Sequence, residues 1–235
     1  MSQEGYEAFK KILDSKGMAF KNRIKSHSFT LNIFTGNASE LNEGLAIIEN
    51  PDVGVKLMSQ QHKQEGLQAH REINRLFHNY LAAAKTLIDH TRVFIEDHYS
   101  DSVVESRYKD KILNEFAHDF LARFVQDLRN FMLHNGLPHN EMTISYVKGV
   151  PSVESSINLD TEKLKEWSRW TKPSKEFLNQ QSKKLSLSDL IEPYSEKVVG
   201  LHNWLLNELN SYHEKDLKEL HELQLALDRL DKNVT

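Results

Sequence analysis

Apolar residues recur at helical spacing over most of the chain. In residues 59–99, which contain no proline and one glycine, apolar side chains lie three or four positions apart and share one face of a helix. The members of this stripe are Ile73, Leu76, Tyr80, Ala84, Leu87 and Phe94. A second stripe predicts a helix over residues 103–134. It consists of Ile112, Phe116, Phe120, Phe124, Leu128 and Phe131.

Helix-breaking sequences separate and end these two predicted helices. Residues 98–102 interrupt the first stripe, and Asn135-Gly136-Leu137-Pro138 ends the second with a glycine followed by a proline. Because the connection between the helices is short, they must run antiparallel. We therefore predict a long antiparallel helical hairpin over residues 59–138.

Residues 142–159 have the alternating pattern of strands. Apolar and polar residues alternate over 143–147 and again over 153–159, and the sequence between them, Lys148-Gly149-Val150-Pro151, is typical of a turn. An isolated hairpin is only marginally stable in water, so we expect this one to pack on the helices. The pattern predicts a small β-hairpin insertion.

A stripe of leucines predicts a long C-terminal helix over residues 188–232. The stripe skips from Tyr212 to Leu217, which predicts a bend there. Before this helix, Asp160 is expected to cap a short helix, and the polar residues 179–188 are expected to form an exposed connection. The apolar side chains of the short helix are Leu164, Trp167 and Trp170.

The first 58 residues show a weaker pattern. We predict a short helix over 6–13, a strand or an extended loop over 29–34, and another short helix over 40–49. No internal repeat is found. The predicted fold is an all-α bundle in a single domain, 1–235, with the β-hairpin as an insertion.

Composition narrows the possible functions. The 12 histidines among 235 residues are roughly twice the usual share. The absence of cysteine excludes disulfides, thiolate metal sites and cysteine nucleophiles. A net charge of -4 argues against charge-driven coating of nucleic acid but allows one local basic site. No apolar run approaches the roughly 20 residues of a membrane span, and no leader pattern opens the chain, so we expect a cytoplasmic protein without membrane contact.

Arg129, Asn130 and His134 lie near the predicted end of the second long helix. On a regular helix, a five-residue separation places Arg129 and His134 about 140° apart, so they converge only where the helix ends or bends, as Asn135-Gly136 predicts. An arginine can hold a phosphate and stabilise its charge, and a histidine can move a proton to or from a ribose oxygen. Asn130 could orient either group.

This segment, Arg129-Asn130-Phe131-Met132-Leu133-His134, resembles the Arg-Asn-x-x-x-His signature of the HEPN superfamily. The resemblance extends over residues 64–138. It implies a compact helical domain, often a metal-independent ribonuclease of toxin or defence systems, which commonly dimerises so that two motifs share one cleft. It further implies that Arg129 and His134 are catalytic and that Asn130 supports them. In the alternative interpretation, Arg129 pairs with a carboxylate and His134 favourably occupies a helix C-terminus.

The antiparallel register predicts neighbours for these residues. It places Arg129 opposite Glu72 and His134 opposite residues 67–70, so that His70, Glu72 and Arg75 crowd the same end of the bundle. A carboxylate there could position Arg129 and tune its neighbours. An ordinary salt bridge between helices is the alternative.

Basic side chains elsewhere could contact an RNA backbone. One group lies along a single stripe of the first long helix, and another lies in a basic stretch near the start of the chain. The residues that we expect to bind RNA are Lys85, Arg92, Lys21 and Arg23. Solvated surface is the alternative for both groups.

The histidines do not have the spacing of a metal site. Glu115-x-x-His118 matches half of a di-iron motif, but the sequence holds no second copy. Glycine-rich phosphate loops are also absent. We predict no metal and no cofactor.

Two functional hypotheses follow. The first is a HEPN-like, metal-independent endoribonuclease of a toxin or phage-defence system, acting as a homodimer on RNA and controlled by an antitoxin or other partner protein. The second is a non-catalytic helical module that dimerises through its long helices, in which charges at Leu220 or Leu227 would abolish assembly.

Overall fold

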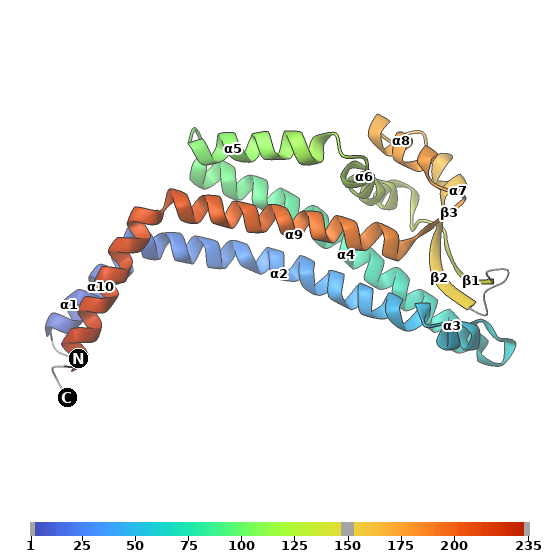
Figure 1. Cartoon of the computed structure of the whole chain (residues 1–235), viewed down its shortest axis with the longest axis horizontal. Coiled ribbons are helices and arrows are strands. Elements are labelled where there is room, and N and C mark those ends of the chain that lie inside the picture. Colours follow the sequence, from blue (N-terminus) through green and yellow to red (C-terminus); the bar gives the residue numbers. More distant parts are fainter. Residues whose placement is uncertain (1–2, 147–152, 233–235) are drawn as a thin grey trace.

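The computed structural model describes residues 3–146 and 153–232, which form an elongated helical bundle with a small sheet near one end (Figure 1). Three long helices run side by side along the bundle: α2 (Lys16–Glu49), α4 (Lys63–Tyr99) and α9 (Leu187–Tyr212). The shorter α5 (Val103–Ile112) lies against α4 and α9. The predicted predominance of helix is confirmed.

The N-terminal region differs most from its prediction. It consists of α1 (Gln3–Asp14), the long α2 and α3 (Pro51–Met58), so the predicted strand or loop at 29–34 and the separate helix at 40–49 are wrong. Both segments belong to α2. Apolar residues occur on two faces of this helix: Phe34 and Leu41 are buried, whereas Phe29 and Ile33 are exposed. No single stripe therefore marks α2 in the sequence.

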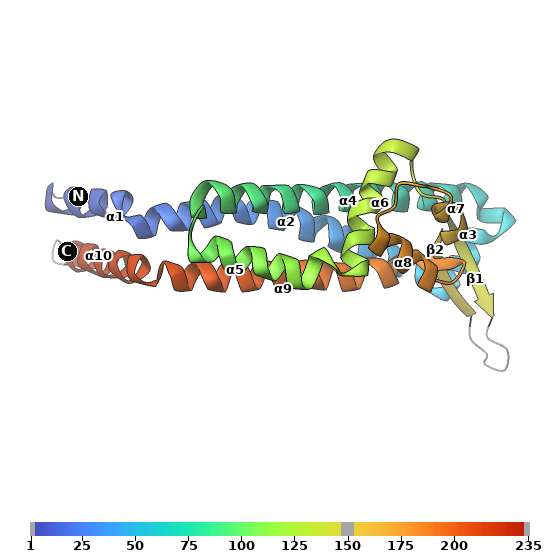
Figure 2. The ribbon, with the colours of Figure 1, turned by 90° about the horizontal axis from the view of Figure 1, so that it is seen from above.

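The second long helix of the predicted hairpin is broken. After α5 come a π-helical turn (Leu113–Ala117) and a separate helix, α6 (Phe120–Asn135), whose first turn is capped by the Asp119 carboxylate. α6 runs across the bundle instead of continuing α5 (Figures 1 and 2). The prediction of one helix over 103–134 is wrong, because the apolar stripe continues through the break and hides the cap at Asp119.

The β-hairpin prediction is confirmed and extended. β1 (Asn140–Tyr146) and β2 (Val153–Asp160) pair antiparallel, and β3 (Lys184–Ser186) adds to the other edge of β2, in the order β1-β2-β3. The expected exposed connection at 179–188 is therefore wrong in part, because it holds β3. The predicted turn at residues 148–151 lies outside the described residues.

Two short helices connect β2 to β3. Asp160 caps α7 (Thr161–Lys165) as expected, although this helix is too short to include Trp167 and Trp170. α8 (Lys172–Gln180) follows, and a short 3-10 turn (Gln60–His62) precedes α4 in the other half of the chain.

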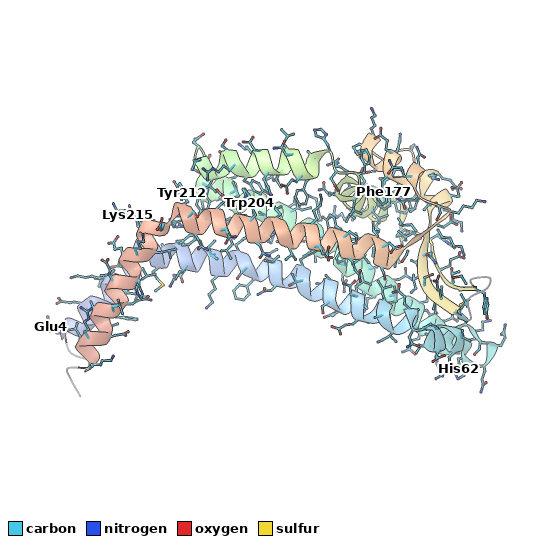
Figure 3. The ribbon with its side chains drawn as sticks, in the orientation of Figure 1. Glu4, His62, Phe177, Trp204, Tyr212 and Lys215 are labelled. Carbon is cyan, nitrogen blue, oxygen red and sulfur yellow. The ribbon has the colours of Figure 1, made fainter. Side chains whose placement is uncertain are left out.

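The C-terminal helix bends where the stripe of leucines skips. α9 ends at Tyr212, and α10 (Glu214–Lys232) begins after His213. α10 packs against α1, and the pair leaves the bundle at an angle; Figure 3 labels Glu4 on this pair and His62 at the opposite end of the molecule. After the bend, α10 lies so close to the start of α2 that only glycine fits at position 17. A Cβ on Gly17 would lie 2.4 Å from the carbonyl oxygen of Asp216 in α10. None of the described helices is long and apolar enough to cross a lipid bilayer.

Candidate functional site

The motif residues lie on the last two turns of α6. Arg129 is half-buried, Asn130 and His134 are exposed, and none of their side chains has a hydrogen bond or an ion pair with another described residue. α6 remains α-helical through Asn135 and ends at Gly136, whose φ is 96°. Since the helix ends only after His134, Arg129 and His134 leave it about 140° apart. The convergence that we expected within one chain is therefore not formed.

A residue that the sequence did not single out fixes α6 in place. Asp127 is buried, and its carboxylate accepts hydrogen bonds from the Thr171 backbone N–H (3.0 Å), the Thr171 hydroxyl (2.6 Å) and the Ser174 hydroxyl (2.7 Å). These donors lie at the start of α8, so Asp127 joins the two helices. In the sequence it is one more acidic residue, and only the fold reveals its partners.

The predicted support of Arg129 by Glu72 is wrong. Glu72 instead pairs with Arg75 on the same helix, accepting at 2.6 and 2.9 Å. The Arg75 guanidinium lowers the pKa of that carboxyl. The predicted pairing of Arg129 with Glu72 holds only for a continuous antiparallel hairpin. It does not apply to α6, which is a separate helix that crosses α4.

His70 ties the sheet to α4. Its Nε2 donates to the Oδ1 of Asn140 (2.6 Å), the Asn140 side chain donates to the Oδ1 of Asn74 (2.7 Å), and Asn74 donates to the His70 carbonyl (2.8 Å). This closed set of hydrogen bonds holds the segment after α6 against α4. His70 thus has a structural role there and does not contact the motif.

A basic hollow lies between α4 and the segment that follows α6. It has a volume of about 630 Å³. Its lining residues are His70, Arg71, Asn74, Arg75, His78, Leu137, Pro138, His139 and Asn140. Arg71 and His78 are exposed and have no polar partner within the described chain. Arg75 is paired with Glu72 and His70 with Asn140, so Arg71 and His78 are the lining groups that suit an anion such as a phosphate.

The predicted RNA-binding residues do not form one surface. Lys85 pairs with Asp89, one turn away on α4. Lys21 is exposed and Arg23 is half-buried, but both lie in the first half of α2, toward the end of the bundle that carries α1 and α10. Arg92 lines a different cavity. These four residues therefore cannot hold one short RNA together with α6.

The described histidines and carboxylates do not assemble a metal site. No group of three or more histidine or carboxylate side chains within the described residues could hold a metal ion. Glu115 and His118 lie at the π turn and its end, where Glu115 pairs with Lys111.

Three histidines gather in the middle of the bundle, which the sequence did not predict. His202 is buried, its Nδ1 donates to the Val198 carbonyl (2.9 Å), and its Nε2 lies 3.0 Å from the Thr91 hydroxyl. The ring of His27 stacks on Phe94, 4.5 Å between centroids, and lies 5.9 Å from the ring of His202. His90 bonds to Thr30 beside them. Burial lowers the pKa of His202, and burial with the neighbouring imidazoles lowers that of His27 to about 4.

Comparison of the chain with protein-family models, with curated proteins and with solved structures found no match.

Proposed function

We propose that the protein binds RNA at the end of α6 and cleaves it without a metal ion, with Arg129 and His134 as catalytic residues and Asn130 in support. The observation that carries this proposal is that all three side chains project from α6 without a protein partner. Polar groups that serve only the fold are normally paired, as Asp127 is in the same helix. The resemblance to the HEPN signature supplies the reaction class.

The basic hollow beside α6 supports the choice of a phosphate ligand. Arg71 and His78 face it from α4, and it borders Leu137 and Pro138, which directly follow the end of α6. An RNA strand that reaches His134 could extend into this hollow, where a guanidinium would bind its backbone.

The 140° separation of the two catalytic side chains requires a second copy of the motif. In the proposed reaction, His134 removes the proton from a ribose 2′-hydroxyl, whose oxygen attacks the adjacent phosphorus while the bond to the 5′-oxygen breaks. The products are a 2′,3′-cyclic phosphate and a 5′-hydroxyl, which takes its proton from His134 of the partner subunit. Arg129 stabilises the charge on the phosphorane.

Exposed apolar residues next to the motif support such a dimer. Leu133 and Leu137 are 58% and 55% exposed, on either side of the end of α6. A second chain packed there would cover both leucines and bring the two motifs together.

The test is cleavage of single-stranded RNA in the presence of EDTA. We expect products ending in 2′,3′-cyclic phosphate, and a loss of about 100-fold or more in rate for His134→Ala and for Arg129→Ala. His221→Ala and Arg229→Ala are matched controls on α10 and should cleave at the unchanged rate. Cleavage that is equal in all four variants, or that requires a metal, would contradict the proposal.

Binding is measured separately by filter retention of the same RNA. Arg71→Ala should weaken binding and reduce the dependence of affinity on salt, because one phosphate contact is lost. If RNA binds in this way but is never cleaved, the hollow is a binding site and the motif residues are not catalytic.

A second candidate function is a dimerisation module without catalysis. Tyr6, Phe9 and Leu13 are 59%, 41% and 52% exposed and share one face of α1. The leucine stripe predicts Leu220 at a dimer seam, but the structure buries it fully within the chain, where α10 meets α1 and α2. A charge at Leu220 would therefore disturb the fold itself, and the outer face of α1 is the better place to test this function.

A further inference from the structure

A second cavity lies inside the bundle, away from the motif. It has a volume of about 420 Å³, is lined by α4, α5, the π turn, α9 and Gln126 of α6, and opens to solvent on one side. Its walls are mainly apolar. The apolar lining residues are Ile88, Ile95, Ile112, Leu113, Phe116, Ala117, Val198 and Leu201. Both its size and its lining are those of small-molecule sites, which span roughly 300–1,000 Å³.

The π turn contributes one wall of this cavity. Leu113, Phe116 and Ala117 all belong to it and all line the cavity. π turns are rare in proteins and frequently lie at functional sites. Here it separates α5 from α6 at the point where the two helices take different directions.

Tyr108 places a free hydroxyl at the cavity. Tyr108 is only 9% exposed as a residue, and its hydroxyl, which is not itself fully buried, has no hydrogen-bond partner within the described residues. Because Tyr108 lines the cavity, its hydroxyl can donate to and accept from a molecule bound there. Burial raises the pKa of Tyr108 to about 12, so the group is a neutral donor and acceptor. A bound molecule would supply the missing partner.

The other polar groups at the cavity carry no net charge. His202 and Thr91 are bonded to each other in its wall, and burial keeps the imidazole neutral by lowering its pKa. Tyr194 and four charged residues complete the lining; the charged residues are two of each sign, and Glu105 and Lys109 form an ion pair at 2.7 Å. The other two are Arg92 and Glu96. Such a rim favours neither an anion nor a cation.

We infer that this cavity binds a neutral, mainly apolar small molecule carrying one polar group that hydrogen-bonds to the Tyr108 hydroxyl. The apolar walls supply most of the binding free energy, and the tyrosine orients the ligand. The inference does not depend on RNA cleavage, because no residue of the cavity belongs to the α6 motif.

The experiment uses a fluorescent apolar probe, N-phenyl-1-naphthylamine, with the full chain. We expect saturable binding of one probe per chain and displacement by 1-octanol. Octanoate and octylammonium, which have the same chain length but carry a charge, should displace it at least 10-fold less well. If probe binding does not saturate, or if either ion displaces as well as octanol, the inference is wrong.

Variants locate the site. Tyr108→Phe keeps the ring but removes the hydroxyl, so it should still bind the probe while its affinity for octanol falls about 5- to 10-fold. Tyr146→Phe, on the exposed strand β1, is the matched control and should change neither value.

Filling the cavity provides the second measurement. Val198→Phe and Ala117→Leu add volume from opposite walls and should each abolish probe binding; thermal melts identify a variant that has not folded. Unchanged probe binding in a folded filling variant would overturn the assignment. An unchanged octanol affinity in Tyr108→Phe would overturn the role of the hydroxyl.

Discussion

At the scale of single residues, the excess of histidine has a structural origin in several places. His27, His90 and His202 meet threonine hydroxyls between α2, α4 and α9. An imidazole can bridge backbone and hydroxyl groups while staying neutral, so it satisfies buried polar atoms without burying a charge. This arrangement makes the bundle sensitive to protonation.

Acidification should therefore destabilise the fold through these histidines. The folded chain holds the pKa of His27 near 4, whereas the unfolded chain has the ordinary value of 6.5, so the unfolded chain binds more protons between these values. The contribution of neutral His27 to the free energy of unfolding is complete above pH 6.5 and is lost as the pH falls toward 4. The slope for one histidine stays below about 1.4 kcal/mol per pH unit. Urea denaturation at pH 7.5, 6 and 5 measures it.

Variants assign this dependence to the cluster. His27→Asn should flatten the decline of stability between pH 6.5 and 5, because the depressed group is removed. His221→Asn, on exposed α10, should keep the decline of the unmodified chain. Equal slopes in both variants would show that the acid sensitivity arises elsewhere.

At the scale of helices and strands, regular patterns were predictable, and breaks were predictable only where the pattern skipped, as after Tyr212, or where a glycine ended it, as at Gly136. The stripe in residues 59–99 identified α4, and alternation identified β1 and β2, because each of these elements buries one face. α2 was missed because it has apolar residues on a second, exposed face. The third strand, Lys184–Ser186, is too short to show a period.

The candidate site depended on such a break. Placing Arg129 and His134 near the end of a helix required only the stripe and Gly136. The neighbours of these two residues depend on the direction of α6. The chain changes direction at Asp119, which caps the new helix, and this single residue is the only sign of the change in the sequence. The hollow formed by Arg71, His78 and His139 follows from that crossing and could not be derived from a straight hairpin.

Asp127 should hold α6 and α8 together as a unit. Asp127→Ala removes the acceptor of three hydrogen bonds at the start of α8, and we expect a loss of about 2–4 kcal/mol in the free energy of unfolding. Asp127→Asn retains one acceptor oxygen and should lose less. Chemical denaturation measures both, and Asp228→Ala on α10 serves as the exposed control. A loss below about 0.5 kcal/mol for Asp127→Ala would contradict this role.

At the scale of the whole molecule, the two exposed apolar surfaces that we propose for dimer contacts, on α1 and at the end of α6, lie far apart. The α1 and α10 pair leaves one end of the bundle, whereas α6 crosses it in the other half (Figures 1 and 2). A symmetric dimer formed through the outer face of α1 would leave the two α6 motifs separated. The proposed ribonuclease therefore requires a dimer formed through α6, whereas the dimerisation module requires a dimer formed through α1.

A charge on either surface decides between these dimers. We expect Leu133→Glu to convert the dimer to a monomer, measured by light scattering, and to abolish RNA cleavage, because it charges the apolar surface beside His134. Phe9→Glu should leave both the dimer and cleavage unchanged. Both side chains are exposed, so neither change buries a charge within the chain. The reverse result, a monomer only with Phe9→Glu, would support the dimerisation module, and a chain that is monomeric without any substitution would contradict both functions.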